Sequence, residues 1–271
     1  MMAPTPVDAP DLDAAAEVLG DLATADVALG PYCTYRVGGP AALFVEVESV
    51  ADLQVVREAV AASGCPTLIV GRGSNLLVAD AGFPGVALHL GSSFETIEIE
   101  VDPDGGRSSV RAGGAALLPV VARKTAGAGL TGFEWAVGVP GSIGGAVRMN
   151  AGGHGSDMAA TLVGVTLFDL VEGGPAEIAA ERLELGYRRS AIGPRHLVVS
   201  AELALAPGDP ERSAAEISEI VAWRRANQPG GQNAGSVFAN PEGDSAGRLI
   251  DSLGLKGFRV GTAQVSTKHA N

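Results

Sequence analysis

The glycine content of this chain constrains its fold more than any other feature, because 38 of its 271 residues are glycine. Glycine weakens helix and strand interiors but permits tight turns and close backbone approach, so a helical bundle is excluded. The glycines follow no collagen-like period and lie between apolar runs in a chain that is 46% hydrophobic, which makes disorder the weaker interpretation. The length suffices for one large domain or two ordinary ones, each with a real core.

The charge balance excludes several classes of partner. A net charge of −12 leaves no basic surface for nonspecific nucleic-acid binding. No apolar run approaches the roughly 18 residues of a membrane span, and residues 1–13 lack the basic and apolar regions of a signal peptide. We therefore expect a cytoplasmic protein without nucleic-acid or membrane partners. Cys33 and Cys65 are too few for a disulfide framework, and we expect two buried or semi-buried thiols.

Short β runs alternate with helical patterns from residue 41 onward, whereas residues 1–30 are expected to be a loosely ordered lead-in. The predicted strands are 43–47, 67–70, 86–90, 94–101, 108–112, 162–170 and 197–205. The predicted helices are 50–63, 117–126, 210–226 and 246–253, the third with Asp209 as N-cap. This order predicts an α+β fold.

Two glycine-rich segments are candidate ligand sites. Gly71-Arg72-Gly73-Ser74-Asn75 follows a β run directly, so its N–H groups can face a phosphate, but alone it is more often a tight turn. The segment from Gly138 to Gly153 is glycine-dense, partly apolar and almost uncharged. A solvated loop would be polar, so backbone packed against a large flat ligand is the favoured interpretation of the second segment.

Two further motifs carry polar candidates. Arg188 and Arg189 are able to clamp a carboxylate or phosphate, but on the residues alone two solvated surface charges are favoured. Ser236 is not followed by the glycine of a nucleophile elbow. Acyl transfer is therefore disfavoured, and Ser236 is better suited to donate a hydrogen bond or a proton.

Taken in order, seven segments resemble the UDP-N-acetylenolpyruvoylglucosamine reductase family from about residue 30 to the end of the chain. Each motif is weak alone, but seven in the same order are specific. They are 34–40, 71–77, 138–152, 187–190, 235–238, 254–257 and 266–271.

The resemblance implies an FAD-binding domain of the vanillyl-alcohol-oxidase (PCMH) type over 31–206. Its two α+β subdomains would span about 31–92 and 93–206, and 207–271 would belong to an incomplete substrate-binding domain. It also implies a monomer that holds FAD noncovalently, takes hydride from NADPH and reduces UDP-N-acetylglucosamine enolpyruvate to UDP-N-acetylmuramate for peptidoglycan synthesis.

Matched motif by motif, the resemblance implies residue roles. Arg188 would stabilise the enolate, Ser236 would protonate the substrate carbon, and Tyr187 and Asn240 would bind substrate. The implied cofactor-binding residues are Tyr35, Arg36, Gly71, Arg72, Gly73, Ser74, Asn75, Leu76, Gly113, Gly138, Val139, Pro140, Gly141, Ser142, Gly144, Gly145 and Asn150. No metal site is implied.

The chain departs from the family pattern at three places. His154 stands where a tyrosine is usual and Ala239 where a lysine is usual. The catalytic glutamate of the family lies beyond the equivalent of Asn271, so none is assigned, and we hypothesise a fragment of a longer reductase. The alternatives are another flavin oxidase on the same fold, or a truncated noncatalytic flavin- or nucleotide-binding protein.

Overall fold

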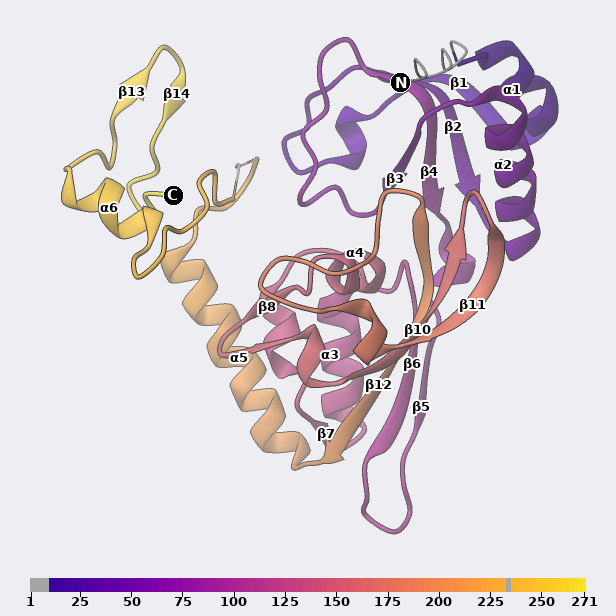
Figure 1. The fold of residues 1–271 in the computed structure, drawn as a ribbon. Coiled ribbons are helices and arrows are strands. Elements are labelled where there is room, and N and C mark those ends of the chain that lie inside the picture. The colour runs from indigo at the N-terminus through magenta and orange to yellow at the C-terminus, as the bar shows by residue number, and fades with distance from the viewer. Residues whose placement is uncertain (1–9, 233–234) are drawn as a thin grey trace, which may run out of the picture.

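The computed structural model describes residues 10–232 and 235–271, which form two sheets with flanking helices and a separate C-terminal segment (Figure 1). The two sheets lie end to end in the molecule. The C-terminal elements stand apart from both sheets, beyond the end of one long helix. In the described part of the chain, no helix combines the length and the apolar character needed to cross a membrane.

The first sheet contains four strands in the order β1-β2-β4-β3. β1 (Ala23–Ala28) is antiparallel to β2 (Pro40–Val47), whereas β4 (Phe83–Leu90) is parallel to both β2 and β3 (Thr67–Val70). Helices α1 (Leu12–Leu19) and α2 (Val50–Ser63) cover one face. Ser49 and Asp52 begin α2 with a reciprocal capping box, and Gly64 ends it in the left-handed conformation at φ 62°.

The expectation of a loosely ordered lead-in is wrong for residues 12–28, because they form α1 and β1. Asp11 caps α1 by accepting from the Ala14 N–H at 3.0 Å, and Ala15 and Leu19 are buried against the first sheet. β1 is an edge strand whose residues are mostly exposed, so it lacks the apolar alternation that identifies a strand in a sequence.

The second sheet is antiparallel, in the order β11-β10-β12-β6-β5, and short β7 pairs with the end of β12. The bounds are β5 (Ile97–Glu100), β6 (Ser108–Gly113), β7 (Leu130–Thr131), β10 (Leu162–Asp169), β11 (Gly173–Ala179) and β12 (His196–Pro207). Alternate residues such as Val110, Leu203 and Leu205 pack with α3 (Leu118–Gly127) in the larger core. The edge strand β11 was not predicted, because it begins with two glycines and a proline.

Helix α5 (Pro210–Asn227) packs on the second sheet's helical layer, and the assignment of 207–271 to an incomplete substrate-binding domain stays a prediction. Ile217 and Ile220 join the larger core. At its start the buried Glu134 carboxylate accepts from Ser213 Oγ at 2.6 Å and from Thr131 Oγ1 at 2.7 Å. Burial acts to raise the pKa of Glu134, but these hydrogen bonds outweigh it and hold the pKa below its ordinary value.

The remaining elements are short. The glycine-rich segment contains α4 (Ile143–Arg148) and a hairpin of β8 (Gly152–Gly153) and β9 (Ser156–Asp157), while the C-terminal segment contains α6 (Ala246–Ser252), β13 (Arg259–Val260) and β14 (Ala263–Gln264). Helix α4 was not predicted, because Gly144 and Gly145 lie inside it. The 3₁₀ turns are Gly20–Leu22, Gly30–Tyr32, Ser92–Phe94, Glu134–Gly138, Met158–Ala160 and Ala180–Leu183. Both cysteines are free and buried, as predicted.

Candidate functional site

Three of the predicted segments meet where the two sheets adjoin. The loop after β3 contacts residues 32–34, because the Thr34 N–H donates to Gly73 O at 3.2 Å. The same loop reaches the glycine-rich segment, since Ser74 Oγ donates to Pro140 O at 3.3 Å. Gly73 has φ 57°, and a Cβ on it would lie 2.0 Å from Tyr32 O. This approach is open only to glycine.

A cavity of about 120 Å³ lies at this junction. The predicted residues that line it are Gly71, Arg72, Ser142, Gly144 and Gly145. Its volume is smaller than the roughly 300 Å³ of a typical small-molecule pocket, so it has room for a phosphate group or a single ring and not for a whole dinucleotide. The junction thus brings together residues from both glycine-rich motifs.

The lining suits an anionic, flat ligand. Arg72 and Arg148 supply positive charge, and His89 and His196 line the same cavity beside one carboxylate, Glu95. Nothing lies within 4 Å of the Cβ position at Gly145, so the glycine leaves open space in the lining. Arginines and glycine backbone in one lining fit the pyrophosphate of FAD. Among the charged residues and histidines of this lining, Arg148, His89, His196 and Glu95 are absent from the sequence prediction. Arg148 lies inside a recognised motif, and the other three lie in none.

Other predicted glycines serve close packing within the protein. A Cβ on Gly113 would lie 2.0 Å from Phe94 O, and one on Gly144 would lie 3.1 Å from Gly114 O. A Cβ on Gly138 would lie 2.9 Å from the His154 ring. These glycines therefore have a packing reason that does not require a ligand, and their cofactor role stays a prediction.

Tyr187 and Arg188 occupy the tip of a two-residue turn. Gly186 and Arg189 exchange backbone hydrogen bonds of 3.1 Å in each direction, which makes them the paired residues at its base. Arg188 has φ 56°, a conformation that glycine or asparagine normally adopts at this position. Both side chains are exposed, Tyr187 at 78%, and the Arg188 guanidinium carbon lies 5.7 Å from the Tyr187 ring centroid. The turn presents a cation and a phenol outward together.

Several of the predicted site residues have a left-handed backbone conformation. Among described non-glycine residues it occurs at Asp26, Arg36, Asn150, His154, Glu184 and Arg188. Three of these, Arg36, Asn150 and Arg188, were predicted from sequence as site residues. Such conformations cost roughly 1–3 kcal/mol each and concentrate at functional sites, which supports a functional role for these three.

Ser236 and Asn240 lie in the C-terminal segment, and their neighbourhood is formed by that segment. The Asn271 side chain brackets the backbone after Ser236: its Oδ1 accepts from the Val237 N–H at 3.0 Å and the Phe238 N–H at 2.8 Å. Its Nδ2 donates to Phe238 O at 2.9 Å. Asn271 thus shapes the backbone that carries exposed Ser236.

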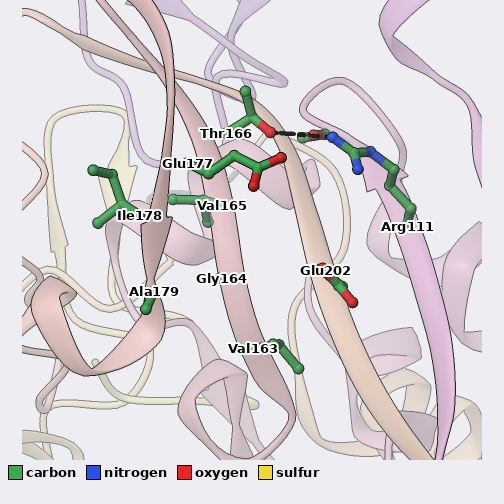
Figure 2. A pocket seen from close by; sticks show the side chains of 10 residues that line it. Arg111, Val163, Gly164, Val165, Thr166, Glu177, Ile178, Ala179 and Glu202 are labelled. Atoms are coloured by element: carbon green, nitrogen blue, oxygen red, sulfur yellow. Dashed lines mark hydrogen bonds between the residues drawn. The ribbon is translucent and has the colours of Figure 1, made fainter.

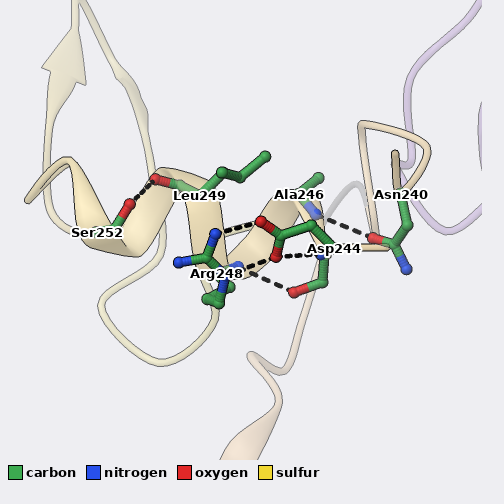
Figure 3. Close-up of polar contacts among 7 residues, drawn as sticks. Asn240, Asp244, Ala246, Arg248, Leu249 and Ser252 are labelled. Carbon is green, nitrogen blue, oxygen red and sulfur yellow. Dashed lines mark hydrogen bonds and ion pairs between the residues drawn. The ribbon is translucent and has the colours of Figure 1, made fainter. Parts of the chain in front are cut away.

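Asn240 belongs to the polar contacts at the start of α6 (Figure 3). Its Oδ1 accepts from the Ala246 N–H at 3.1 Å, and Arg248 donates two hydrogen bonds to Asp244. The Arg248 side chain lowers the pKa of Asp244 to about 2, so this pair stays ionised across neutral pH. One face of the Asn240 amide is therefore already used to hold α6.

The two residues that differ from the family pattern, His154 and Ala239, lie in different parts of the structure. His154 lies at the tip of the β8–β9 hairpin, and its ring packs edge-on to Trp223 of α5 with centroids 5.2 Å apart. It therefore connects the glycine-rich segment to the helix that leads to the C-terminal segment. Ala239 is exposed within that segment.

A second hollow, of about 310 Å³, lies on the face of the second sheet that α3 does not cover (Figure 2). Its polar lining includes Arg111, which donates to Thr166 Oγ1 at 3.2 Å, together with Glu177 and Glu202. No residue predicted from the sequence lines it. An antiparallel sheet commonly leaves one face open to solvent, and this hollow lies on such a face. The candidate site is therefore the cavity at the junction of the two sheets.

Two family models match the chain. The FAD binding domain matches residues 41–174, and the C-terminal domain of UDP-N-acetylenolpyruvoylglucosamine reductase matches residues 227–271. A UDP-N-acetylenolpyruvoylglucosamine reductase of Synechococcus sp. (strain RCC307) is 41% identical over 249 residues, covering 91% of this chain and 80% of the relative. The chain belongs to the UDP-N-acetylenolpyruvoylglucosamine reductase family.

Further comparisons agree with this family of oxidoreductases. The reductase of Synechococcus sp. (strain WH7803) is 43% identical over 254 residues, covering 90% of this chain and 79% of that relative. The crystal structure of the reductase from Thermus caldophilus matches with a TM-score of 0.78 and 38% identity, over 92% of this chain and 86% of that one.

The fold extends beyond the reductase family. A VAO-type flavoprotein of Myceliophthora thermophila matches with a TM-score of 0.54 at 11% identity, over 76% of this chain and 49% of that chain. At this identity the likeness concerns the fold alone. Together with the matched FAD binding domain, it confirms the predicted α+β flavin-binding fold of the vanillyl-alcohol-oxidase type.

Proposed function

We propose that this reductase binds FAD noncovalently and uses NADPH to reduce UDP-N-acetylglucosamine enolpyruvate to UDP-N-acetylmuramate, as a cytoplasmic monomer in peptidoglycan precursor synthesis. The observation that carries the proposal is the meeting of Gly71–Ser74 and Pro140–Gly145 at one cavity, in a chain of this family. The lining supplies arginine and glycine backbone where a dinucleotide phosphate needs them.

The residues would divide the work as follows. Bound FAD would accept hydride from NADPH and supply it to the enolpyruvyl group of the substrate. Arg72 and the glycines of the cavity would hold the cofactor. Arg188 would stabilise the negative charge that develops on the substrate carboxylate as an enolate, because a fixed cation acts most strongly where charge appears. Ser236 Oγ would donate a proton to the carbon next to that carboxylate.

Substrate would be held by residues from both ends of the site. Tyr187 lies beside Arg188 on the exposed turn, and Asn240 lies close to Ser236 along the chain. The turn and the C-terminal segment contribute separate residues, so the substrate itself would join Arg188 to Ser236. Arg188 is placed by its turn, and Ser236 by the backbone that Asn271 brackets.

The test separates the two half-reactions. The absorbance spectrum of the purified protein is taken before and after denaturation, and free flavin in the denatured sample establishes noncovalent binding. NADPH is then added without oxygen to bleach the flavin, followed by UDP-N-acetylglucosamine enolpyruvate. We expect rapid recovery of the oxidised spectrum and formation of UDP-N-acetylmuramate.

Variants identify the roles of the two catalytic candidates. Arg188→Ala and Ser236→Ala should slow the substrate-dependent recovery by about 10²–10³-fold and leave bleaching by NADPH unchanged. Arg189→Ala, which changes the adjacent arginine, is the matched control. A flavin that stays attached after denaturation, or recovery that needs oxygen rather than the enolpyruvyl substrate, would show that the oxidase alternative is correct.

A further inference from the structure

The turn that carries Arg188 is fastened to the end of α4 on both sides. On one side, Asn150 Nδ2 donates to Gly186 O at 3.2 Å. On the other, Ser190 Oγ donates to Arg148 O at 2.7 Å. Gly186 and Ser190 flank the turn residues 187–189, so both ends of the turn are held by the same short piece of chain.

The Asn150 side chain is committed to contacts inside the protein. Besides Gly186 O, its Nδ2 donates to Asp157 Oδ2 at 3.1 Å, and its Oδ1 accepts from the Ala159 N–H at 3.0 Å. The residue is 5% exposed. Both amide hydrogens are used, so the side chain has no donor left for a cofactor.

Neither aspartate nor glycine satisfies these three partners. Aspartate has no donor for Gly186 O and would set a second carboxylate against Asp157. Glycine would suit the φ of 38° but would lose all three side-chain hydrogen bonds. The strained backbone of Asn150 is therefore accompanied by a side-chain amide that donates to Gly186 O.

Helix α4 joins this anchor to the candidate flavin cavity. Gly144, Gly145 and Arg148 line the cavity, and Asn150 follows two residues after the helix ends. A helix of six residues spans about 9 Å and has little freedom to flex. The position of the turn is thereby set relative to the cavity by one rigid connection.

We propose that Asn150, with Ser190, is a positioning residue that sets Arg188 relative to the flavin cavity. The proposal rests on the role proposed above for Arg188, and it replaces direct cofactor binding as the function of the Asn150 side chain. Misplacing a catalytic cation by about 1 Å costs on the order of 10²-fold in rate, so a modest shift of the turn has a large effect.

The principal variant is Asn150→Gly, which keeps the left-handed backbone accessible and removes the hydrogen bonds. Glu184→Gly is the matched control, because Glu184 is an exposed residue with φ 48° two positions before Gly186. Ser190→Ala tests the second fastening and serves if Asn150→Gly does not fold. Each variant is made in the full chain and loaded with FAD.

The first readout is structural and independent of any reaction. Hydrogen exchange at the Arg189 N–H, which bonds to Gly186 O at 3.1 Å, should be at least tenfold faster in Asn150→Gly than in the wild type and unchanged in Glu184→Gly. Unchanged exchange in both Asn150→Gly and Ser190→Ala would overturn the proposal. This readout decides it even if the wild type fails to reduce the enolpyruvyl substrate, an outcome that would instead refute the proposed function.

The second readout uses Arg188 itself. Asn150→Gly should slow substrate-dependent flavin recovery by about 10–100-fold while bleaching by NADPH is unchanged. In an Arg188→Ala background the same substitution should have no further effect, because the residue that it positions is gone. Equal slowing in both backgrounds, or slowing accompanied by weaker FAD binding, would show a general structural role and overturn the proposal.

Discussion

Gly145 should affect stability and cofactor binding in opposite directions when it is replaced by alanine. It lies inside α4, where alanine is preferred to glycine by about 0.5–1 kcal/mol. Its φ is not left-handed and nothing lies within 4 Å of the added Cβ, so the methyl group would not clash with the protein. Gly145→Ala should therefore raise the melting temperature of the FAD-free protein by about 1–4 °C.

The same methyl group would enter the cavity that we assign to the flavin. Forcing an extra methyl into a filled site costs about 1–3 kcal/mol, which corresponds to FAD binding weakened by about 5–150-fold. The melting temperature is measured by differential scanning fluorimetry on protein stripped of flavin. The dissociation constant is measured by titration of FAD flavin fluorescence.

Gly127→Ala is the control for this pair of measurements. Gly127 ends α3, also has open space around its Cβ position and does not line the cavity. It should raise the melting temperature without changing the affinity for FAD. If Gly145→Ala raised the melting temperature and bound FAD as tightly as the wild type, the space beside Gly145 would not be occupied by the flavin and the assignment of the cavity would be refuted.

Three further predictions follow from single contacts. Glu134→Gln should lower the free energy of unfolding by about 2–4 kcal/mol at pH 7, measured by urea denaturation. Because the folded pKa of Glu134 lies below its ordinary 4.5, its contribution is present above that value and is lost as pH falls through the folded pKa, so the variant should be less sensitive to acid than the wild type. Gly73→Ala should abolish FAD binding, since the added Cβ would lie 2.0 Å from Tyr32 O; retained affinity would show that the two loops move independently. Asn271→Ala should slow flavin recovery by substrate without affecting bleaching by NADPH, as expected for Ser236→Ala, and an unaltered rate would separate the Asn271 contacts from catalysis.

The regular elements of the fold were largely predictable, because their signals are local. Ser49 and Asp52 form a capping box that begins α2, and Asp209 and Pro210 begin α5. Strands β2, β3, β6 and β12 carry continuous or alternating apolar runs that identify them. The order of seven short motifs was specific enough to indicate the family, although each motif alone is compatible with an ordinary turn.

Other elements were missed because tertiary contacts outweigh local preference. β1 and β11 are edge strands without a clear apolar pattern, and each is stabilised by pairing with one neighbour. Helix α4 contains two glycines and forms where its backbone packs beside Gly114. In each case the element is stabilised by contacts with neighbouring backbone and not by a clear apolar pattern of its own.

The sequence by itself determined which residue types are available to the site: two glycine-rich segments, two adjacent arginines and a serine after glycine. Only the tertiary structure decided how they are placed. It brought Ser74 to Pro140 across 66 positions, and it brought the Asn150 side chain within hydrogen-bonding distance of Gly186 O. A motif records the chemistry that a residue is able to perform, whereas the partner that uses its donors depends on which distant backbone the fold brings within hydrogen-bonding distance.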